Sequence, residues 1–536
     1  MFHFWNLFIQ NLYGQWEFFS IQNFQAGLGQ FYSHGFSNTA DPQQPAEFGV
    51  QQLGGYIGDQ WRVRSNVTLT YGVRLDVPRF PDTPHANPLT VTDFGLRTDA
   101  VPTPKMWSPR IGVNWDLSNG ATSKSQIRGG IGYFTGRTPY VWLSNQYGNT
   151  GVDFTTISTS VAAGNSIPFV ADPNAQPLNV TGAAAGRQSV NLIDPDYKYP
   201  SVVRGNIAYD RDLGFWGLVG TGELLLSKNV NEVAYQNINF VPASTLPDGR
   251  FVYRKVDANL NDALLLTNTS LGSTWTASFK VERPFRNGFY ASGSYLYNDA
   301  RSINDGTAST AGSNWANTPI GIDTNNAPLT RSNFSVGSRL NVTGVVPIPL
   351  GRSIHSTASF FYNGQSGRPY VILFNGDANL DNRSNNDIAF IPASADQVIL
   401  QNGSWDQLNA FISSDPASKD NRGTIPARNS GRAPWSNSLD FRYGVNVPTG
   451  GKTKVELTMD IINLLNLLNK EWGWQYFPLF PSSSANGLIG YGGIDPVTGK
   501  ERLNLSTITS PTFQGTFQRD DLRSRWQAQW GVRVRF

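Results

Sequence analysis

The residues whose types and spacing best suit chemistry form one run of oxygen-bearing side chains. Asp377, Asn379 and Asp381 occupy positions 1, 3 and 5 of a calcium-loop spacing, which lets three oxygen ligands converge on one hard cation. Asp387 falls one place before the twelfth-position ligand, and Asn382 replaces the usual glycine at the sixth position. The spacing predicts a calcium loop that uses these four oxygen donors. The alternative is a polar loop in which Asp and Asn residues form turns.

Other catalytic chemistry has little support in the sequence. The chain has no cysteine, which removes thiolate catalysis, disulfide frameworks and cysteine-type zinc sites together. Neither a Gly-x-Ser-x-Gly elbow nor a phosphate-binding loop occurs. The four histidines have no spacing that suggests a metal pair; they are His3, His34, His85 and His355. The sequence therefore predicts that the protein is not an enzyme and that calcium is its candidate cofactor.

Aromatic side chains are also candidates for ligand binding, because their flat apolar faces can stack on sugars. One set recurs at period two among Val and Leu residues, which favours the aromatic girdles of a membrane barrel instead; it comprises Trp115, Tyr133, Tyr295 and Trp530. Aromatic residues of the expected loops are better candidates for ligand contact, and they include Trp142, Tyr147, Trp315 and Trp405.

The elements that position these residues are predicted to be strands, most clearly at the C-terminus. Between residues 526 and 536 apolar residues alternate with Gln, Gly and Arg, and the apolar face includes Trp530, Val532, Val534 and Phe536. A tilted transmembrane strand spans about 9–11 residues, although an edge strand of a soluble sandwich shows the same alternation. A terminal Phe closing such a strand resembles the assembly signal of bacterial outer-membrane barrels, which implies recognition by the barrel-assembly machinery.

The same alternation recurs along the chain and predicts roughly fourteen to sixteen strands. The clearest segments are 53–63, 66–76, 110–117, 125–135, 201–210, 220–227, 275–281, 289–297, 334–342, 354–362, 439–447 and 455–461. Short turns join some of them, at residues 64–65, 118–123, 286–288 and 448–451, whereas long polar loops are expected at 78–104, 149–199, 298–331, 374–433 and 472–517. Short connections at one rim and long ones at the other are typical of a membrane barrel. Residues 461–470 favour a strand end or short turn, with a short helix as the alternative.

Composition agrees with an all-β membrane protein and excludes several other classes. Charged residues make up 15% of the chain, against about 25% in average proteins. Because mean hydropathy is −0.32 and no run of about 18 apolar residues occurs, a helical membrane protein is excluded. The formal net charge of +3 is small and the basic residues are scattered, so nothing points to nucleic acid.

Four segments resemble the barrel of TonB-dependent receptors of the Oar-like type: 107–113, 128–137, 284–295 and 463–473. The resemblance covers residues 56–536. It implies a transmembrane antiparallel barrel of about 22 strands in the bacterial outer membrane, a plug, and coupling to the TonB complex. It also implies that the partners are outer-membrane lipid and an extracellular ligand of unknown identity.

Two features depart from that family pattern. Nothing before Tyr56 resembles a plug or a TonB box, and the apolar residues 1–10 lack the basic region and cleavage site of a secretory signal. We therefore expect residues 1–536 to be the C-terminal barrel portion of a longer receptor. The expected function is ligand binding and uptake. The alternatives are a surface structural or adhesion protein anchored by the barrel, and a passive porin.

Overall fold

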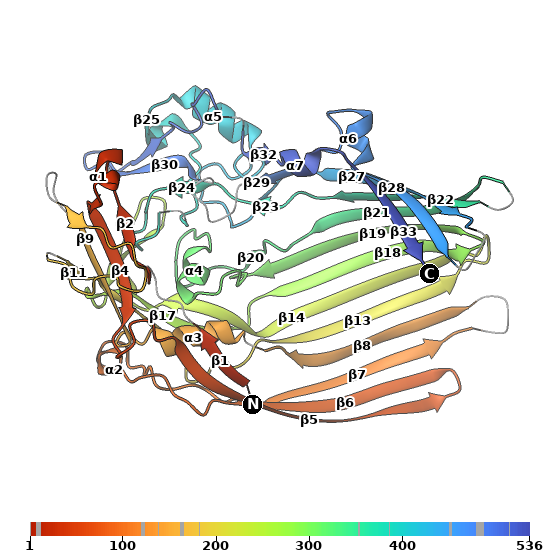
Figure 1. Cartoon of the computed structure of the whole chain (residues 1–536), viewed down its shortest axis with the longest axis horizontal. Coiled ribbons are helices and arrows are strands. Elements are labelled where there is room, and N and C mark those ends of the chain that lie inside the picture. Colours follow the sequence, from red (N-terminus) through yellow and green to blue (C-terminus); the bar gives the residue numbers. More distant parts are fainter. Residues whose placement is uncertain are drawn as a thin grey trace.

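The fold is dominated by one large, curved antiparallel sheet, seen in a computed structural model (Figure 1). The structure describes residues 2–6, 12–118, 124–137, 139–160, 166–181, 183–351, 354–384, 386–449, 453–478, 487–513 and 515–536. Thirteen strands of this sheet form a wall in sequence order: β5 (Ala46–Arg64), β6 (Val67–Arg79), β7 (Met106–Asp116), β8 (Ser125–Thr135), β13 (Ser201–Asp212), β14 (Val219–Asn237), β18 (Ser273–Arg286), β19 (Phe289–Ser302), β21 (Gly337–Pro349), β22 (His355–Gln365), β27 (Ser436–Val447), β28 (Lys454–Ile462) and β33 (Gln527–Arg535). The expected all-β fold is confirmed, with each wall strand near a segment that the alternation predicts.

The strand registers give the wall two continuous faces of opposite character. Val73 pairs with Ile57 and Pro109, and Val532 pairs with Leu457, so the apolar positions of neighbouring strands share one side, the outer face. The predicted girdle residues Trp115, Tyr133, Tyr295 and Trp530 lie on this outer face. The opposite, lumen face carries ion pairs between adjacent strands, including Arg128–Asp210, Arg442–Asp460 and Arg533–Glu456. Apolar outside and charged inside is the pattern of a membrane barrel rather than of a soluble sandwich.

The connections between wall strands differ sharply at the two ends of the sheet. The short connections between β5 and β6 and between β18 and β19 lie at the right in Figure 1. The intervening connections are long and lie at the left and along the top of Figure 1, at what we name the loop end. The turns predicted at 118–123 and 448–451 lie partly outside the described residues.

Both outermost strands of the wall have an unpaired edge in the described part of the chain. Register runs from β5 through to β33, and no residue of β33 is in register with β5. Side chains of these two strands are largely exposed: the exposed fraction is 73% for Ile57 and 76% for Trp530. At the loop end of β5, residues 46–50 lie beyond the pairing with β6 and pair antiparallel with β1 (Phe2–Asn6).

The loops of the first two thirds of the chain fold against the loop end of the wall. Their helices are α1 (Ile21–Gln25), α2 (Pro88–Phe94), α3 (Tyr140–Gly148) and α4 (Ala311–Ala316). Their strands are β2 (Gln15–Glu17), β3 (Leu28–Gly29), β4 (Phe31–Ser37), β9 (Phe154–Ser160), β10 (Ile167–Pro168), β11 (Ala184–Ala185), β12 (Gln188–Ile193), β15 (Phe240–Thr245), β16 (Phe251–Lys255), β17 (Leu260–Thr269) and β20 (Thr330–Arg331). Phe48, Tyr147, Phe240, Leu266 and Trp315 belong to their largest buried cluster. Burial of these side chains, most of them aromatic, stabilises the folded loops.

Two further loops combine into a second compact unit, which we name the cap. Residues 366–435 contribute β23 (Pro369–Tyr370), β24 (Leu373–Asn375), η1 (Ala395–Gln397), β25 (Val398–Gln401), α5 (Trp405–Ser414) and β26 (Gly431–Arg432). Residues 463–526 contribute α6 (Leu464–Leu468), β29 (Tyr476–Pro478), β30 (Gly487–Ile494), β31 (Glu501–Asn504), β32 (Phe517–Arg519) and α7 (Asp521–Ser524). The two loops share one sheet, of order β24-β30-β31-β25, and one buried core that includes Phe374, Leu408, Ile489 and Leu503.

Two helices of the cap show how its local sequence determines its structure. Helix α5 begins at a capping box, in which Ser404 Oγ accepts from Gln407 N at 3.4 Å and Gln407 Oε1 accepts from Ser404 N at 2.9 Å. The preference for a strand end or turn at residues 461–470 was wrong after Ile462, because Asn463 takes a left-handed φ of 54° and starts α6. No helix among the described residues has the length and hydrophobicity needed to cross a bilayer.

Candidate ligand-binding site

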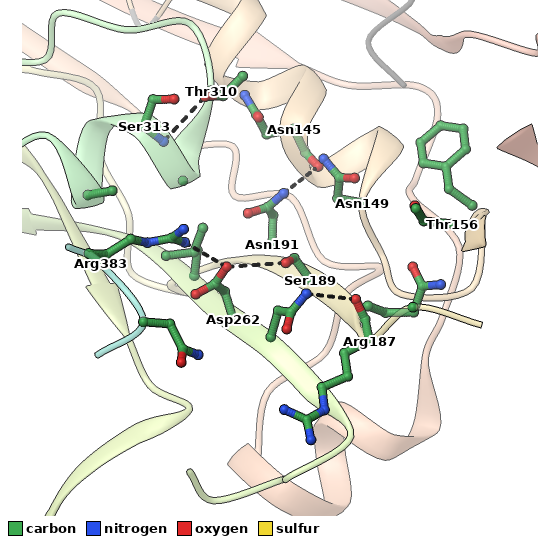
Figure 2. Close-up of a pocket in the computed structure, with 18 of the residues that line it drawn as sticks. Asn145, Asn149, Thr156, Arg187, Ser189, Asn191, Asp262, Thr310, Ser313 and Arg383 are labelled. Atoms are coloured by element: carbon green, nitrogen blue, oxygen red, sulfur yellow. Dashed lines mark hydrogen bonds and ion pairs between the residues drawn. The ribbon is translucent and has the colours of Figure 1, made fainter. Parts of the chain in front are cut away.

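A cavity of about 880 Å³ lies among the folded loops at the loop end of the wall (Figure 2). It is lined by residues of α3, β9, β12, β17, α4 and the loop at 382–384. Pockets that hold small-molecule ligands have volumes of about 300–1,000 Å³. Most of the lining side chains are carboxamides or hydroxyls, and Phe154 is the aromatic residue among them. None of the four loop aromatics named as ligand candidates lines this cavity, and Phe154 had no sequence signal.

One wall of the cavity is organised by Asn145 at the end of α3. Its Nδ2 donates to Ser309 O at 3.0 Å and its Oδ1 accepts from Ala311 N at 3.2 Å, which ties α3 to the start of α4. The Asn145 carbonyl accepts from Asn191 Nδ2 at 3.2 Å, while Asn191 N donates to Asn149 O at 2.8 Å. These bonds hold α3, α4 and β12 in fixed positions around the cavity.

The opposite wall is organised by Asp262 of β17. Its Oδ1 accepts from Asn237 Nδ2 at 2.8 Å, and its Oδ2 accepts from Ser189 Oγ at 3.3 Å and from Arg383 Nη2 at 2.9 Å. The Arg383 guanidinium also lies 5.6 Å from the centre of the Trp315 ring, a cation–π distance. Asp262 therefore joins two strands of the loop end to the loop that carries Arg383.

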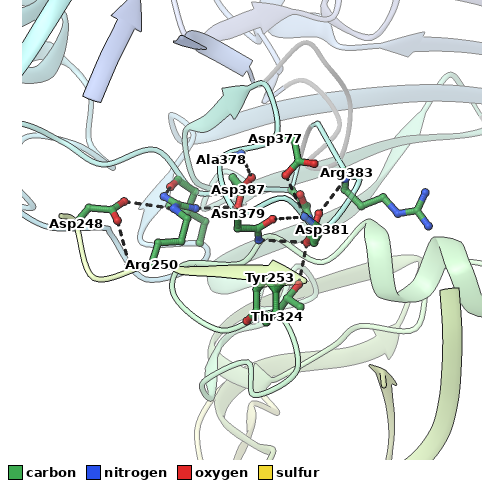
Figure 3. Close-up of polar contacts among 12 residues, drawn as sticks. Asp248, Arg250, Tyr253, Thr324, Asp377, Ala378, Asn379, Asp381, Arg383 and Asp387 are labelled. Carbon is green, nitrogen blue, oxygen red and sulfur yellow. Dashed lines mark hydrogen bonds and ion pairs between the residues drawn. The ribbon is translucent and has the colours of Figure 1, made fainter. Parts of the chain in front are cut away.

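That same loop, which is part of the cap, is joined to the β15–β16 hairpin by a buried cluster of charges (Figure 3). Arg250, which is 0% exposed, donates from Nη1 to Asp387 Oδ1 at 2.9 Å and from Nε to Asp248 Oδ2 at 3.3 Å. Glu501 of β31 is buried nearby, and neither of its carboxylate oxygens has a hydrogen-bond partner among the described residues. Removing one partner of such a buried pair is strongly destabilising, so the cluster fixes the cap on the β15–β16 hairpin.

The four residues of the predicted calcium loop lie together in this region. Asp381 N donates to Asp377 Oδ1 at 3.2 Å and to Asn379 Oδ1 at 2.9 Å, so the first three form a tight turn. Asp387 faces Arg250 instead, and calcium would have to compete with this guanidinium for it. In the described part of the chain no three acidic, histidine or cysteine residues are arranged to hold a metal ion. The calcium site stays a prediction.

The sequence matches one protein-family model, described as the outer membrane beta barrel domain, over residues 2–471. The chain belongs to this family. No curated protein sequence matches the chain. The expected location of the barrel in the bacterial outer membrane is thereby confirmed.

Solved structures align with most of this outer-membrane barrel at low sequence identity. A mutant ferric enterobactin receptor, PfeA from Pseudomonas aeruginosa, has 11% identity and a TM-score of 0.44, with 95% of this chain and 50% of the receptor covered. The copper transporter OprC has 8% identity and a TM-score of 0.39, with 86% and 52% covered. The FrpB iron transporter from Neisseria meningitidis has 10% identity and a TM-score of 0.33, with 81% and 55% covered. The barrel spans about half the length of these proteins.

The terminal residues of the barrel lie where the alternation places them. Trp530, Val532 and Val534 share the outer face with the apolar residues of β28, and Phe536 follows β33 with 99% of its surface exposed. Recognition of these residues by the assembly machinery stays a prediction.

The cap of this barrel is expected to loosen as pH rises, because of Glu501. Burial, followed by the charge of Asp248, raises the pKa of the Glu501 carboxyl to about 8. An unfolded Glu titrates near pH 4.3, so the folded cap binds the extra proton and loses stability between about pH 4.3 and 8. We expect the free energy of cap opening to fall by at least about 1–3 kcal/mol over this range, the cost of a buried polar group without a partner.

Hydrogen exchange of the β30–β31 amides at pH 5 and pH 8, corrected for intrinsic rates, measures this opening. Glu501→Gln should remove the pH dependence, whereas Glu471→Gln, at an exposed site in the same loop, should retain it. Equal pH dependence in both variants would show that Glu501 is not the titrating group.

Proposed function

We propose that residues 1–536 form the barrel portion of a TonB-dependent outer-membrane receptor of the Oar-like type, which binds an extracellular ligand at its loop end for uptake. The observation that carries the proposal is the cavity among the folded loops, walled by the bonds of Asn145 and Asp262. A plug and contact with the TonB complex would be supplied by parts of the receptor outside this sequence. In this role the protein moves its ligand across the membrane without changing it chemically.

Energy-coupled uptake can be distinguished from a passive pore and from a surface anchor with the purified complete receptor. Liposomes that contain the receptor should not swell in arabinose, because a plugged barrel admits no steady solute flow. The periplasmic domain of TonB should be retained by the immobilised receptor. Swelling would indicate a passive porin. Absence of both swelling and TonB retention would favour a surface structural or adhesion protein.

A further inference from the structure

The charged side chains that line the cavity among the loops do not cancel. Its lining contains two arginines and one aspartate, Arg187, Arg383 and Asp262, so one positive charge is in excess. Arg383 is paired with Asp262 at 2.9 Å. The Arg187 guanidinium has no ion-pair partner among the described residues and lies at the edge of the residues drawn in Figure 2. The cavity therefore offers a single cation to a ligand.

The remaining polar side chains of the lining are neutral, and several of them make no hydrogen bond within the described part of the protein. Four carboxamide side chains have no hydrogen-bond partner in the described part of the structure: Asn149, Gln188, Asn317 and Asn382. Carboxamides donate from nitrogen and accept at oxygen, and serine and threonine hydroxyls do both at one atom. Groups of this kind match ligand hydroxyls, which also donate and accept. The buried Asn191 Oδ1 beneath them likewise has no donor among the described residues.

Few apolar side chains line the cavity. These are Phe154, Leu264 and Ala316, and Phe154 presents one flat ring of the kind that stacks on a sugar. A peptide with large apolar side chains would find few partners here, and a ligand with several phosphates would find only one unpaired cation. A hydroxyl-rich ligand with one carboxylate fits the cavity better than either.

We propose that this cavity binds an acidic saccharide, with Arg187 pairing with its carboxylate and the carboxamides bonding to its hydroxyls. The proposal rests on the receptor function proposed above and names the chemical class of its ligand. At about 880 Å³, the cavity has room for a short oligosaccharide rather than a single sugar. Arg187 is a specificity-determining residue in this arrangement, since it distinguishes acidic from neutral sugars.

Two disaccharides that differ by one carboxylate test the proposal: cellobiouronate and cellobiose. Calorimetric titration of the purified complete receptor should show tighter binding of cellobiouronate. Arg187→Gln should weaken cellobiouronate binding by about 10-fold or more, the usual worth of a hydrogen bond to a charged group, and change cellobiose binding by less than about 2-fold. Arg368→Gln, another exposed arginine at the loop end outside the cavity, is the matched control and should change neither.

A second variant tests the neutral part of the site. Asn149→Leu should weaken both disaccharides to a similar extent, because it removes a hydroxyl partner without changing charge. Absence of binding of both sugars at 10 mM, on the order of the weakest affinities worth measuring, would overturn the proposal. Equal effects of Arg187→Gln and Arg368→Gln would also overturn it. Retention of TonB by a receptor that binds neither sugar would reject the ligand class and leave the receptor function standing.

Discussion

Residues 1–536, targeted to the outer membrane with a signal peptide and no further segment, are expected to give no heat-modifiable, protease-resistant barrel. The reason lies in the two open edges, at residues 51–64 of β5 and along β33. In hydrocarbon each unpaired backbone donor or acceptor costs several kcal/mol, and closed barrels avoid this by having no edge. Mobility in unboiled gels and resistance to external protease are the measurements.

Strand direction makes this expectation sharper. The wall has thirteen strands in an antiparallel series, so β5 and β33 run in the same direction. They cannot close as an antiparallel pair, so a closed and fully antiparallel barrel would contain an odd number of further strands between them. A resistant, monomeric barrel from residues 1–536 would show instead that β5 and β33 pair directly in parallel.

The complete receptor proposed above is the protein in which the role of the terminal strand can be measured. Deletion of Phe536 should reduce assembly, since the ring is an outer-face residue at the end of β33 and is the residue expected to be recognised. Arg535→Gln, a lumen-face change one residue away, should leave assembly unaltered. Similar assembly of the two variants would mean that Phe536 is not part of the signal.

Val73→Arg is expected to destabilise the barrel by about 2–4 kcal/mol, the cost of a cationic side chain facing lipid near the bilayer midplane. Val73 is central in β6, and on the outer face it lies between Ile57 and Pro109. The matched change is Thr70→Arg, because Thr70 is on the lumen face of the same strand, where water and polar side chains solvate the charge. Urea titration of the refolded receptor in lipid vesicles compares the two.

Gly72 is a poorer choice for the lumen-face control. A Cβ at Gly72 would lie 2.8 Å from the backbone oxygen of Ile57, so any side chain there displaces the neighbouring strand. Equal loss of stability in Val73→Arg and Thr70→Arg would show that the two faces of the wall are assigned wrongly.

The wall could be predicted from sequence because its signal is local. Period-two alternation marks all thirteen strands, and the register then places Val73, Tyr295 and Trp530 on the outer face as expected. The predicted strands are shorter than the observed ones where Asn, Gly or Pro residues interrupt the alternation. In β14 the prediction covers 220–227 and the strand is Val219–Asn237.

The loop end could not be predicted because its structure depends on distant contacts. The loops were expected to be polar connections, whereas short strands pair there across long separations in the sequence, as β24 does with β30. Nothing near Arg250 in the sequence indicates that it will be buried against Asp387. The calcium spacing stays a prediction for this loop, in which Asp387 forms an ion pair with Arg250 and Arg383 pairs with Asp262 at the cavity.

The shared sheet of the cap also sets an order of events during biogenesis. Strands β24 and β25 lie between β22 and β27 in the chain, whereas β30 and β31 lie between β28 and the final strand. Neither loop can complete the sheet alone, and both must first be translocated to the same side of the membrane. Because β30 lies between β24 and β31, the shared sheet is completed only after both loops have reached that side.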